Sequence, residues 1–82
     1  MRKILYFTAA WCGPCKALGP VMDSLQEQIN FDKIDVDTNT ELSAQYGVRG
    51  VPSLILLENK NEVGRLVGVQ SKEAILNFYK NN

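Results

Sequence analysis

Two spacings of hydrophobic residues recur along the chain and predict where strands and helices lie. Lys3–Thr8 is a short apolar run with aromatic and branched side chains, which is typical of a buried strand. Apolar residues then recur at every third or fourth position, which predicts a helix over Gly13–Ile29. The residues on this helical face are Leu18, Val21, Met22, Leu25 and Ile29. Pro14 fits the first turn of the helix, where no N–H is needed, whereas Pro20 should bend it.

The middle of the chain predicts a second strand and a short helix. Phe31–Val36 alternates its side chains between two faces, so we expect a strand there. Thr38–Glu41 fits a capping box, in which the first and last side chains satisfy each other's backbone N–H groups. The helix that it opens should run to about Tyr46, with Gly47 as its C-cap.

The last third predicts a hairpin and a final helix. Pro52 precedes a strand over Ser53–Glu58, and a turn at Asn59–Asn61 leads into a strand over Glu62–Val67. Ser71 should cap a helix whose buried face is Ala74, Ile75, Phe78 and Tyr79. A strand–helix–strand start requires parallel pairing through a right-handed crossover, and the hairpin adds antiparallel strands. We therefore expect an α/β fold with a four-stranded mixed sheet, order 2-1-3-4, and three helices on both faces.

Composition narrows the class of protein. The 82 residues, 45% of them apolar, suffice for one compact domain, and we expect residues 1–82 to form it. Nine basic and nine acidic residues cancel, which argues against a nucleic-acid binder driven by charge. The aliphatic run Leu54–Leu57 is far too short to span a membrane. Met1–Trp11 weakly resembles a signal peptide, but cleavage there would remove a core strand, so we expect no export signal.

The chain has two cysteines and no histidine. It therefore lacks the commonest general base and the commonest zinc ligand, and it cannot supply the four ligands of a structural zinc site. We expect no metal and no prosthetic cofactor, so any chemistry must depend on the two thiols.

Cys12 and Cys15 are three residues apart at the start of a helix that follows a strand. This spacing allows a disulfide, and the helix N-terminus should lower the pKa of a thiol there and favour the thiolate that performs disulfide exchange. We expect Cys12, at the mouth of the helix, to attack and Cys15, one turn inside, to resolve the mixed disulfide. The alternatives are inert core cysteines, half of a metal site shared with a second chain, and a purely structural disulfide.

Several segments in order resemble the thioredoxin family. Trp11–Lys16 (WCGPCK) resembles its active-site motif, and Pro20 matches the proline in its active-site helix. Lys33–Asp37, Gly47–Ser53 and Val67–Gly68 resemble three further landmarks. The resemblance covers nearly the whole chain but not the family's N-terminal strand and helix. It implies a minimal thioredoxin-like fold, with Trp11, Gly13 and Pro14 completing the motif around the cysteines.

The resemblance also implies a substrate-binding surface. The Val51–Pro52 bond should be cis, and the Val51 backbone should pair with an extended polypeptide. An apolar rim around Cys12 should consist of Trp11, Gly50, Val51, Gly68 and Val69. The alternatives are that Trp11 is a core aromatic residue and that Pro52 is an ordinary trans turn proline.

One family feature is missing. The family has a buried aspartate six residues before its first active-site cysteine, where this chain has Tyr6. Lys33 matches the lysine that acts with that aspartate in proton transfer to the second cysteine, and it could equally be a plain surface lysine. The base for Cys15 therefore stays open among Lys33, Asp35, Tyr6 and water.

The resemblance implies a protein-disulfide reductase, a monomer in the cytoplasm that a thioredoxin reductase-type donor recycles. The Gly13–Pro14 dipeptide resembles that of reducing members of the family. One alternative is a glutaredoxin-like carrier recycled by glutathione. The other is a non-catalytic binding module that docks a partner through the apolar rim.

Overall fold

The computed structural model describes all 82 residues, Met1–Asn82. The chain forms, in order, β1 (Arg2–Thr8), α1 (Gly13–Asp23), β2 (Phe31–Asp35), α2 (Thr40–Gln45), β3 (Ser53–Glu58), β4 (Asn61–Val67) and α3 (Lys72–Asn81). The sheet order is β2-β1-β3-β4, with β1 parallel to β2 and antiparallel to β3, and with β3 antiparallel to β4. The predicted fold class and strand order are confirmed.

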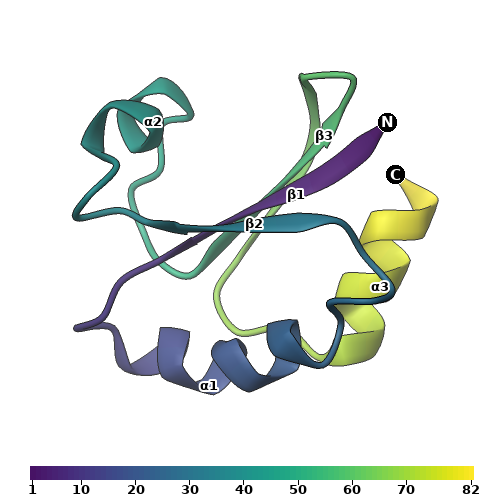
Figure 1. Ribbon diagram of the computed structural model, residues 1–82, viewed down its shortest axis with the longest axis horizontal. Helices are drawn as coiled ribbons and strands as arrows, with labels where there is room; N and C mark the ends of the chain where they lie inside the picture. Colours follow the sequence, from purple (N-terminus) through teal and green to yellow (C-terminus); the bar gives the residue numbers. More distant parts are fainter.

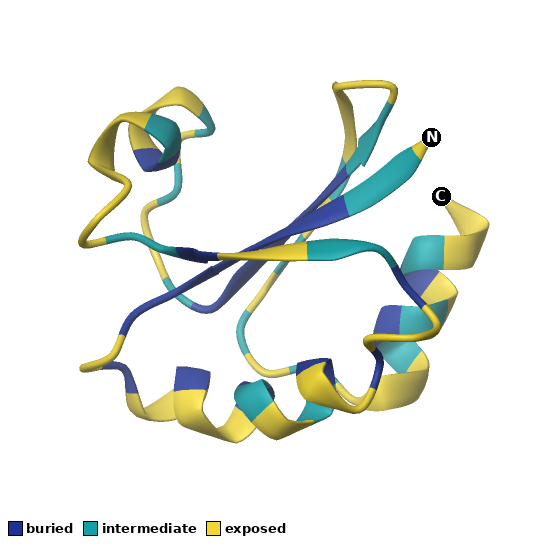
Figure 2. Ribbon diagram, viewed as in Figure 1, coloured by how far each residue is buried: buried dark blue, intermediate teal, exposed yellow.

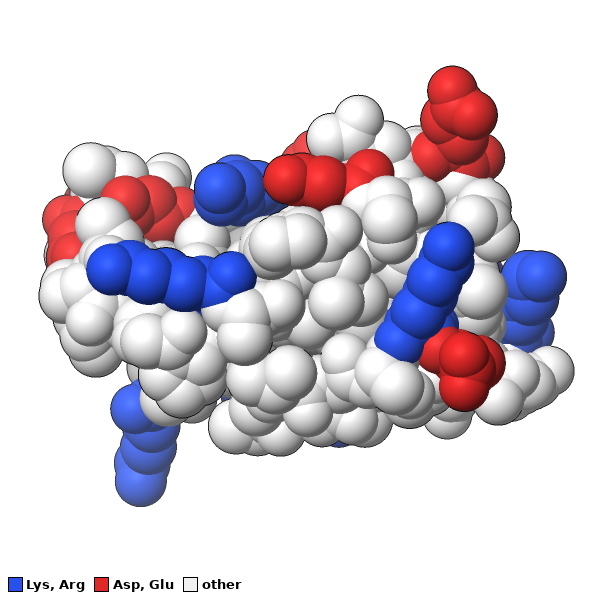
Figure 3. Space-filling view, turned by 90° about the horizontal axis from the view of Figure 1, so that it is seen from below, with Lys and Arg blue, Asp and Glu red and all other residues white.

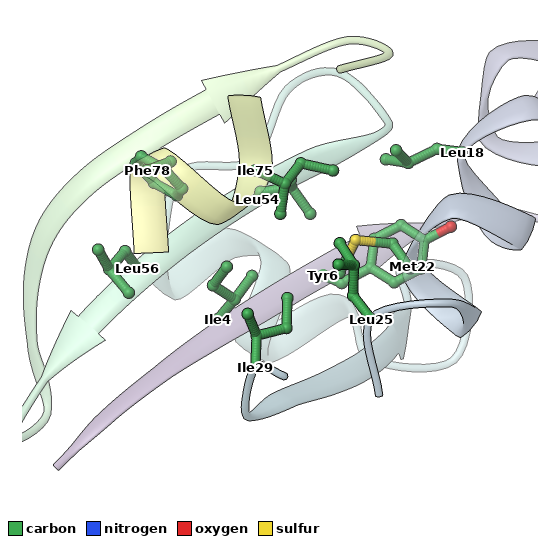
Figure 4. Close-up of a cluster of buried hydrophobic side chains, with 10 residues drawn as sticks. All are labelled: Ile4, Tyr6, Leu18, Met22, Leu25, Ile29, Leu54, Leu56, Ile75 and Phe78. Carbon is green, nitrogen blue, oxygen red and sulfur yellow. The ribbon is translucent and has the colours of Figure 1, made fainter. Parts of the chain in front are cut away.

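Helices cover both faces of the sheet: α1 and α3 lie on one side and α2 on the other (Figure 1). Between the sheet and the α1–α3 pair lies the larger core (Figure 4), made of Ile4, Tyr6, Leu18, Met22, Leu25, Ile29, Leu54, Leu56, Ile75 and Phe78. The α2 side has a smaller core of Leu5, Phe7, Ile34 and Ile55. Successive β1 side chains enter opposite cores, because side chains alternate along a strand. The centre of the sheet is therefore buried on both faces (Figure 2), which explains the continuous apolar run of β1.

Helix α1 ends at Asp23, six residues earlier than the sequence predicted. Beyond it the backbone forms tight turns, in which Leu25 N–H donates to Met22 O (2.9 Å) and Gln28 N–H donates to Leu25 O (2.9 Å). Leu25 and Ile29 are nevertheless buried in the larger core. The prediction was wrong because these turns keep an apolar spacing that cannot be distinguished from that of a helix.

The ends of α2 and α3 test the capping predictions. The capping box at Thr38 is wrong: the N-cap of α2 is Asn39, without a side-chain cap bond. The Thr38 hydroxyl and the Asn39 amide both donate to Asp35 O, because the chain turns back on the end of β2. The C-cap of α2 is Tyr46 rather than the predicted Gly47, which follows it in the left-handed conformation (φ +62°). Ser71 caps α3 as predicted, accepting the Ala74 N–H at 3.1 Å.

The hairpin between β3 and β4 closes through two residues, Asn59 and Lys60. Their φ angles are 52° and 75°, so both adopt the left-handed conformation that a two-residue hairpin turn requires. Asn61, predicted in the turn, begins β4 instead. Lysine is an unfavourable choice at this φ, because its Cβ crowds the backbone there.

Candidate active site

Cys12 lies at the junction between β1 and α1. It is the N-cap of α1, with an extended backbone (φ −89°, ψ 115°), and Pro14 occupies the first turn. Its Sγ accepts the Cys15 N–H at 3.2 Å, so the thiol itself satisfies one of the free donors at the helix start. Both cysteines are free thiols. Cys12 is 5% exposed and Cys15 3%, so their neighbours rather than their exposure distinguish them.

The surroundings of Cys12 act on its pKa in opposite directions. Burial raises the pKa of the Cys12 thiol, and its hydrogen bond with the Cys15 side chain raises it further, whereas the Cys15 N–H lowers it. The net direction is upward. The sequence predicted a lowered pKa from the helix N-terminus. That effect is present as one N–H bond, but burial outweighs it.

The loop that precedes β3 brings a second segment to Cys12. The Val51–Pro52 bond is cis, as the resemblance implies. The Cys12 thiol donates to Val51 O at 3.5 Å. Gly68 N–H donates to Pro52 O (2.9 Å), and the Ser53 hydroxyl donates to Gly50 O (2.6 Å), so this loop is attached to the end of β4 and to its own start. Gly68 has φ +90°, a conformation that favours glycine over any residue with a Cβ.

Trp11 is at the surface, with 69% of the residue exposed, and the alternative of a core aromatic is therefore wrong. Its indole N–H donates to Asp37 Oδ2 at 2.9 Å, which fixes the orientation of the ring. A shallow groove of about 110 Å³ beside it is lined by Trp11, Val36, Val48, Arg49, Gly50 and Val51. The structure thus places Trp11, Gly50 and Val51 of the predicted rim together. Val69, 50% exposed, follows Gly68 on the other side of Pro52.

A second hollow lies behind Cys15. This cavity has a volume of about 310 Å³ and is lined by Tyr6, Thr8, Ala9, Ala10, Cys15, Lys16, Gly19, Lys33 and Asp35. The register of β1 and β2 explains why strand residues meet here, because Tyr6 pairs with Lys33 and Thr8 with Asp35. Tyr6 is only 2% exposed, and burial raises the pKa of its phenol. The two residues proposed for pKa tuning, Tyr6 and Lys33, therefore do line the same space as Cys15.

Two residues near the cysteines were missed by the sequence analysis. Asp37, just beyond β2, holds the indole of Trp11, and Arg49 lines the groove. No spacing rule connects either residue with Cys12, since both reach the site through loops. Ala9 shares a small buried cluster with Cys12 and Cys15, against which Val36 and Val51 pack.

The rest of the molecule offers neither a metal site nor a membrane-spanning helix. No group of three or more His, Cys, Asp or Glu side chains could hold a metal ion. No helix is both long and apolar enough to cross a bilayer. On the face seen from below, on the side of α1 and α3, charged side chains of both signs are scattered without a broad patch of either (Figure 3).

Comparison with known proteins gives one consistent match. The family model described as Thioredoxin matches residues 2–81. A curated thioredoxin of Chlamydia caviae is 38% identical over 76 residues, which are 89% of this chain and 74% of that protein. A solved structure, that of a mutant thioredoxin from Halobacterium salinarum, has a TM-score of 0.90 and 42% identity, covering 96% of this chain and 72% of its own.

A further relative is a fusion protein. The bifunctional thioredoxin reductase/thioredoxin of Mycobacterium leprae is 39% identical over 74 residues. These residues are 85% of this chain and 16% of that protein, so the similarity covers one segment of a much longer chain.

Proposed function

The chain belongs to the thioredoxin family and is a thiol–disulfide oxidoreductase, and we propose that it reduces protein disulfides with Cys12 as the attacking thiol and Cys15 as the resolving thiol. The observation that supports these roles is the difference in what the two sulfur atoms face. Cys12 contacts Val51, which lines the groove, whereas Cys15 lines the cavity. A substrate sulfur that enters by the groove therefore meets Cys12 first.

The reaction has two exchange steps. The Cys12 thiolate attacks one sulfur of the substrate disulfide, and the other substrate sulfur leaves as a thiolate and takes up a proton. The Cys15 thiolate then attacks Cys12 Sγ, which releases the second substrate thiol and forms the Cys12–Cys15 disulfide. Two electrons pass from the cysteine pair to the substrate, the cysteine pair releases two protons, and the two substrate sulfurs take up two.

Substrate binding should use the backbone of the cis-proline loop. The Val51 N–H has no hydrogen-bond partner within the chain, so it is free to bond an extended polypeptide. Trp11, Gly50, Pro52, Gly68 and Val69 would contact the residues that flank the substrate cysteine. Few of these contacts are polar, so the surface suits many sequences and selects mainly for an accessible disulfide.

We further propose that the 82 residues act as a single monomeric domain in the cytoplasm, without a prosthetic cofactor. Two neighbouring cysteines that are not joined by a structural disulfide are typical of proteins in compartments that keep thiols reduced. The electron donor would be a thioredoxin reductase-type protein. The Mycobacterium leprae relative, whose name joins both activities in one chain, supports that pairing.

The equilibrium reduction potential of the Cys12–Cys15 pair tests this function. We expect about −270 mV against a defined thiol buffer, the range of a general protein-disulfide reductant. A value of about −200 mV would instead favour the glutathione-recycled carrier. If no disulfide forms at any potential, the redox function is wrong. The binding-module alternative then predicts that a Cys12→Ser, Cys15→Ser double variant keeps the biological activity.

A further inference from the structure

The cavity behind Cys15 is the only hollow that the resolving thiol shares with ionisable side chains. Five residues bring titratable or charged groups to it: Tyr6 from β1, Cys15 and Lys16 from α1, and Lys33 and Asp35 from β2. Asp23, on α1, also acts on Tyr6 electrostatically. A space of about 310 Å³ is large enough for several water molecules, each of which occupies about 30 Å³.

The resolving step needs a proton acceptor at this place. Cys15 is buried, so bulk solvent does not reach its sulfur directly. Only the thiolate can attack Cys12 Sγ. The proton on Cys15 must therefore leave during or before the attack, and this cavity is where Cys15 lies together with other ionisable side chains.

Most groups around the cavity cannot accept that proton. The ammonium groups of Lys16 and Lys33 carry only donors and no lone pair. Tyr6 keeps its phenolic proton at neutral pH, because burial raises its pKa above the already high ordinary value. Asp35 has the only carboxyl group that lines the cavity, and an ionised carboxylate is an acceptor without a donor.

The position of Asp35 is well fixed. It pairs in register with Thr8 at the end of the parallel strands β1 and β2. Its Oδ1 accepts the Asp37 N–H at 2.8 Å, so one oxygen is bound and the carboxyl group is oriented. Asp35 is half-buried, whereas Lys33 is exposed. The carboxyl group therefore lies at the boundary between the cavity and solvent, where a proton can both arrive and leave.

We propose that Asp35 accepts the proton of Cys15 through water in this cavity, and that it serves as the base of the resolving step. This rests on the exchange mechanism proposed above. The proton passes from Cys15 Sγ to water and on to Asp35, while the electron pair left on sulfur forms the new bond to Cys12 Sγ. The bond between Cys12 and the substrate sulfur breaks, and that sulfur leaves with the bonding pair and takes a proton from solvent. Asp35 then returns its proton to solvent.

Asp35→Asn tests the proposal with little change of shape, because the amide oxygen can still accept the Asp37 N–H. The matched control is Asp32→Asn, which removes a carboxylate from the same strand, where Asp32 pairs with Lys3 at 3.0 Å. Reduced wild-type and variant proteins are mixed with a peptide disulfide. The mixed disulfide is trapped by acid at successive times and measured by mass spectrometry over a range of pH.

We expect Asp35→Asn to slow the decay of the mixed disulfide by about tenfold or more at neutral pH, since general bases typically contribute a factor of about 10² to 10⁴. Its rate should converge with that of the wild type in alkaline solution, where hydroxide can remove the proton. Formation of the mixed disulfide by Cys12 should be unchanged. Asp32→Asn should follow the wild type at every pH.

Three results would contradict the proposal, and a fourth would contradict the exchange function on which it rests. An unchanged pH profile for Asp35→Asn, with an active wild type, would overturn the role of Asp35 and leave the exchange function intact. A uniform loss at all pH values would indicate structural damage and would also overturn it. If Lys33→Gln, and not Asp35→Asn, slows the decay of the mixed disulfide at neutral pH and reaches the wild-type rate in alkaline solution, the base is Lys33. A wild type that forms no mixed disulfide would overturn the exchange function itself.

Discussion

The groove beside Trp11 and Val51 and the cavity that Cys15 lines differ sharply, although the two cysteines are one helical turn apart. The groove is shallow, about 110 Å³, and backbone and apolar side chains form much of it. The cavity is about 310 Å³ and holds a carboxyl group, a phenol and two ammonium groups. The groove suits the docking of a polypeptide, and the cavity suits the movement of a proton.

The same helix start therefore serves two tasks. Its geometry places both sulfur atoms, but the elements packed around it determine which sulfur meets the substrate and which lines the cavity with ionisable side chains. The cis-proline loop approaches Cys12 through Val51 O, whereas β1 and β2 approach Cys15 through Tyr6 and Asp35. Substitutions on the groove side should alter substrate binding, and substitutions on the cavity side should alter the rate at which Cys15 resolves the mixed disulfide.

The largest effect should come from replacing either sulfur atom by the oxygen of serine. Cys12→Ser should reduce protein-disulfide reduction to the background rate, because no thiol is left on the groove side. Cys15→Ser should instead accumulate mixed disulfides, because the attack proceeds and the release does not. Insulin reduction and mass spectrometry of the products would distinguish them. Equal behaviour of the two variants would refute the assigned roles.

A charge on the predicted apolar rim around Cys12 should have the next largest effect. Val69→Asp should raise KM for a peptide disulfide by about tenfold, equivalent to about 1.4 kcal/mol, because the carboxylate must be desolvated when the peptide docks. Reduction of the small uncharged bis(2-hydroxyethyl) disulfide should stay the same. Val63→Asp is the matched control, since Val63 on β4 is similarly exposed, 45% against 50%. Equal KM values for both variants would show that Val69 does not contact substrate.

The pH dependence of Cys12 should be a smaller but diagnostic effect. Because burial raises the pKa of Cys12, alkylation of the Cys15→Ser variant by iodoacetamide should keep accelerating about tenfold per pH unit up to and beyond the ordinary thiol pKa of about 8.5. The folded state holds this proton more tightly than the unfolded state. Its contribution to stability is therefore present below that pKa and lost as pH rises through the folded value. A plateau in rate at neutral pH would contradict the upward shift.

The smallest effect concerns a residue that lines neither the groove nor the cavity. Lys60→Gly should raise the free energy of unfolding by about 0.5–1 kcal/mol, because glycine adopts the φ of 75° without crowding. Urea unfolding would measure it. Lys72→Gly, in the first turn of α3, should lower it by a similar amount. Neither variant should change KM or the rate at which the mixed disulfide is resolved. A change in KM or in that rate would mean that the groove and the cavity respond to global stability.

Much of the fold was predictable because each element carries its own local signal. The apolar run of β1 and the cap at Ser71 depend on neighbours in the sequence, and the structure has them as predicted. The strand β2 is also present, but it ends at Asp35, one residue before the predicted Val36. The end of α1 was not predictable, because Leu25 and Ile29 stay buried whether the backbone is helical or turned. The capping box at Thr38 failed because Asp35 O, at the end of β2, binds the side chains expected to cap the helix.

The sequence by itself determined the order of elements, the strand order and the pair of thiols at a helix start, because these depend on periodicity and spacing along the chain. Only the tertiary structure decided how the thiols differ. The raised pKa of Cys12, the bond between Trp11 and Asp37 and the cavity shared by Asp35 and Cys15 all join segments that are distant in sequence or depend on burial. Desolvation and through-space contacts have no period along a chain, so they appear only once the sheet and helices have packed.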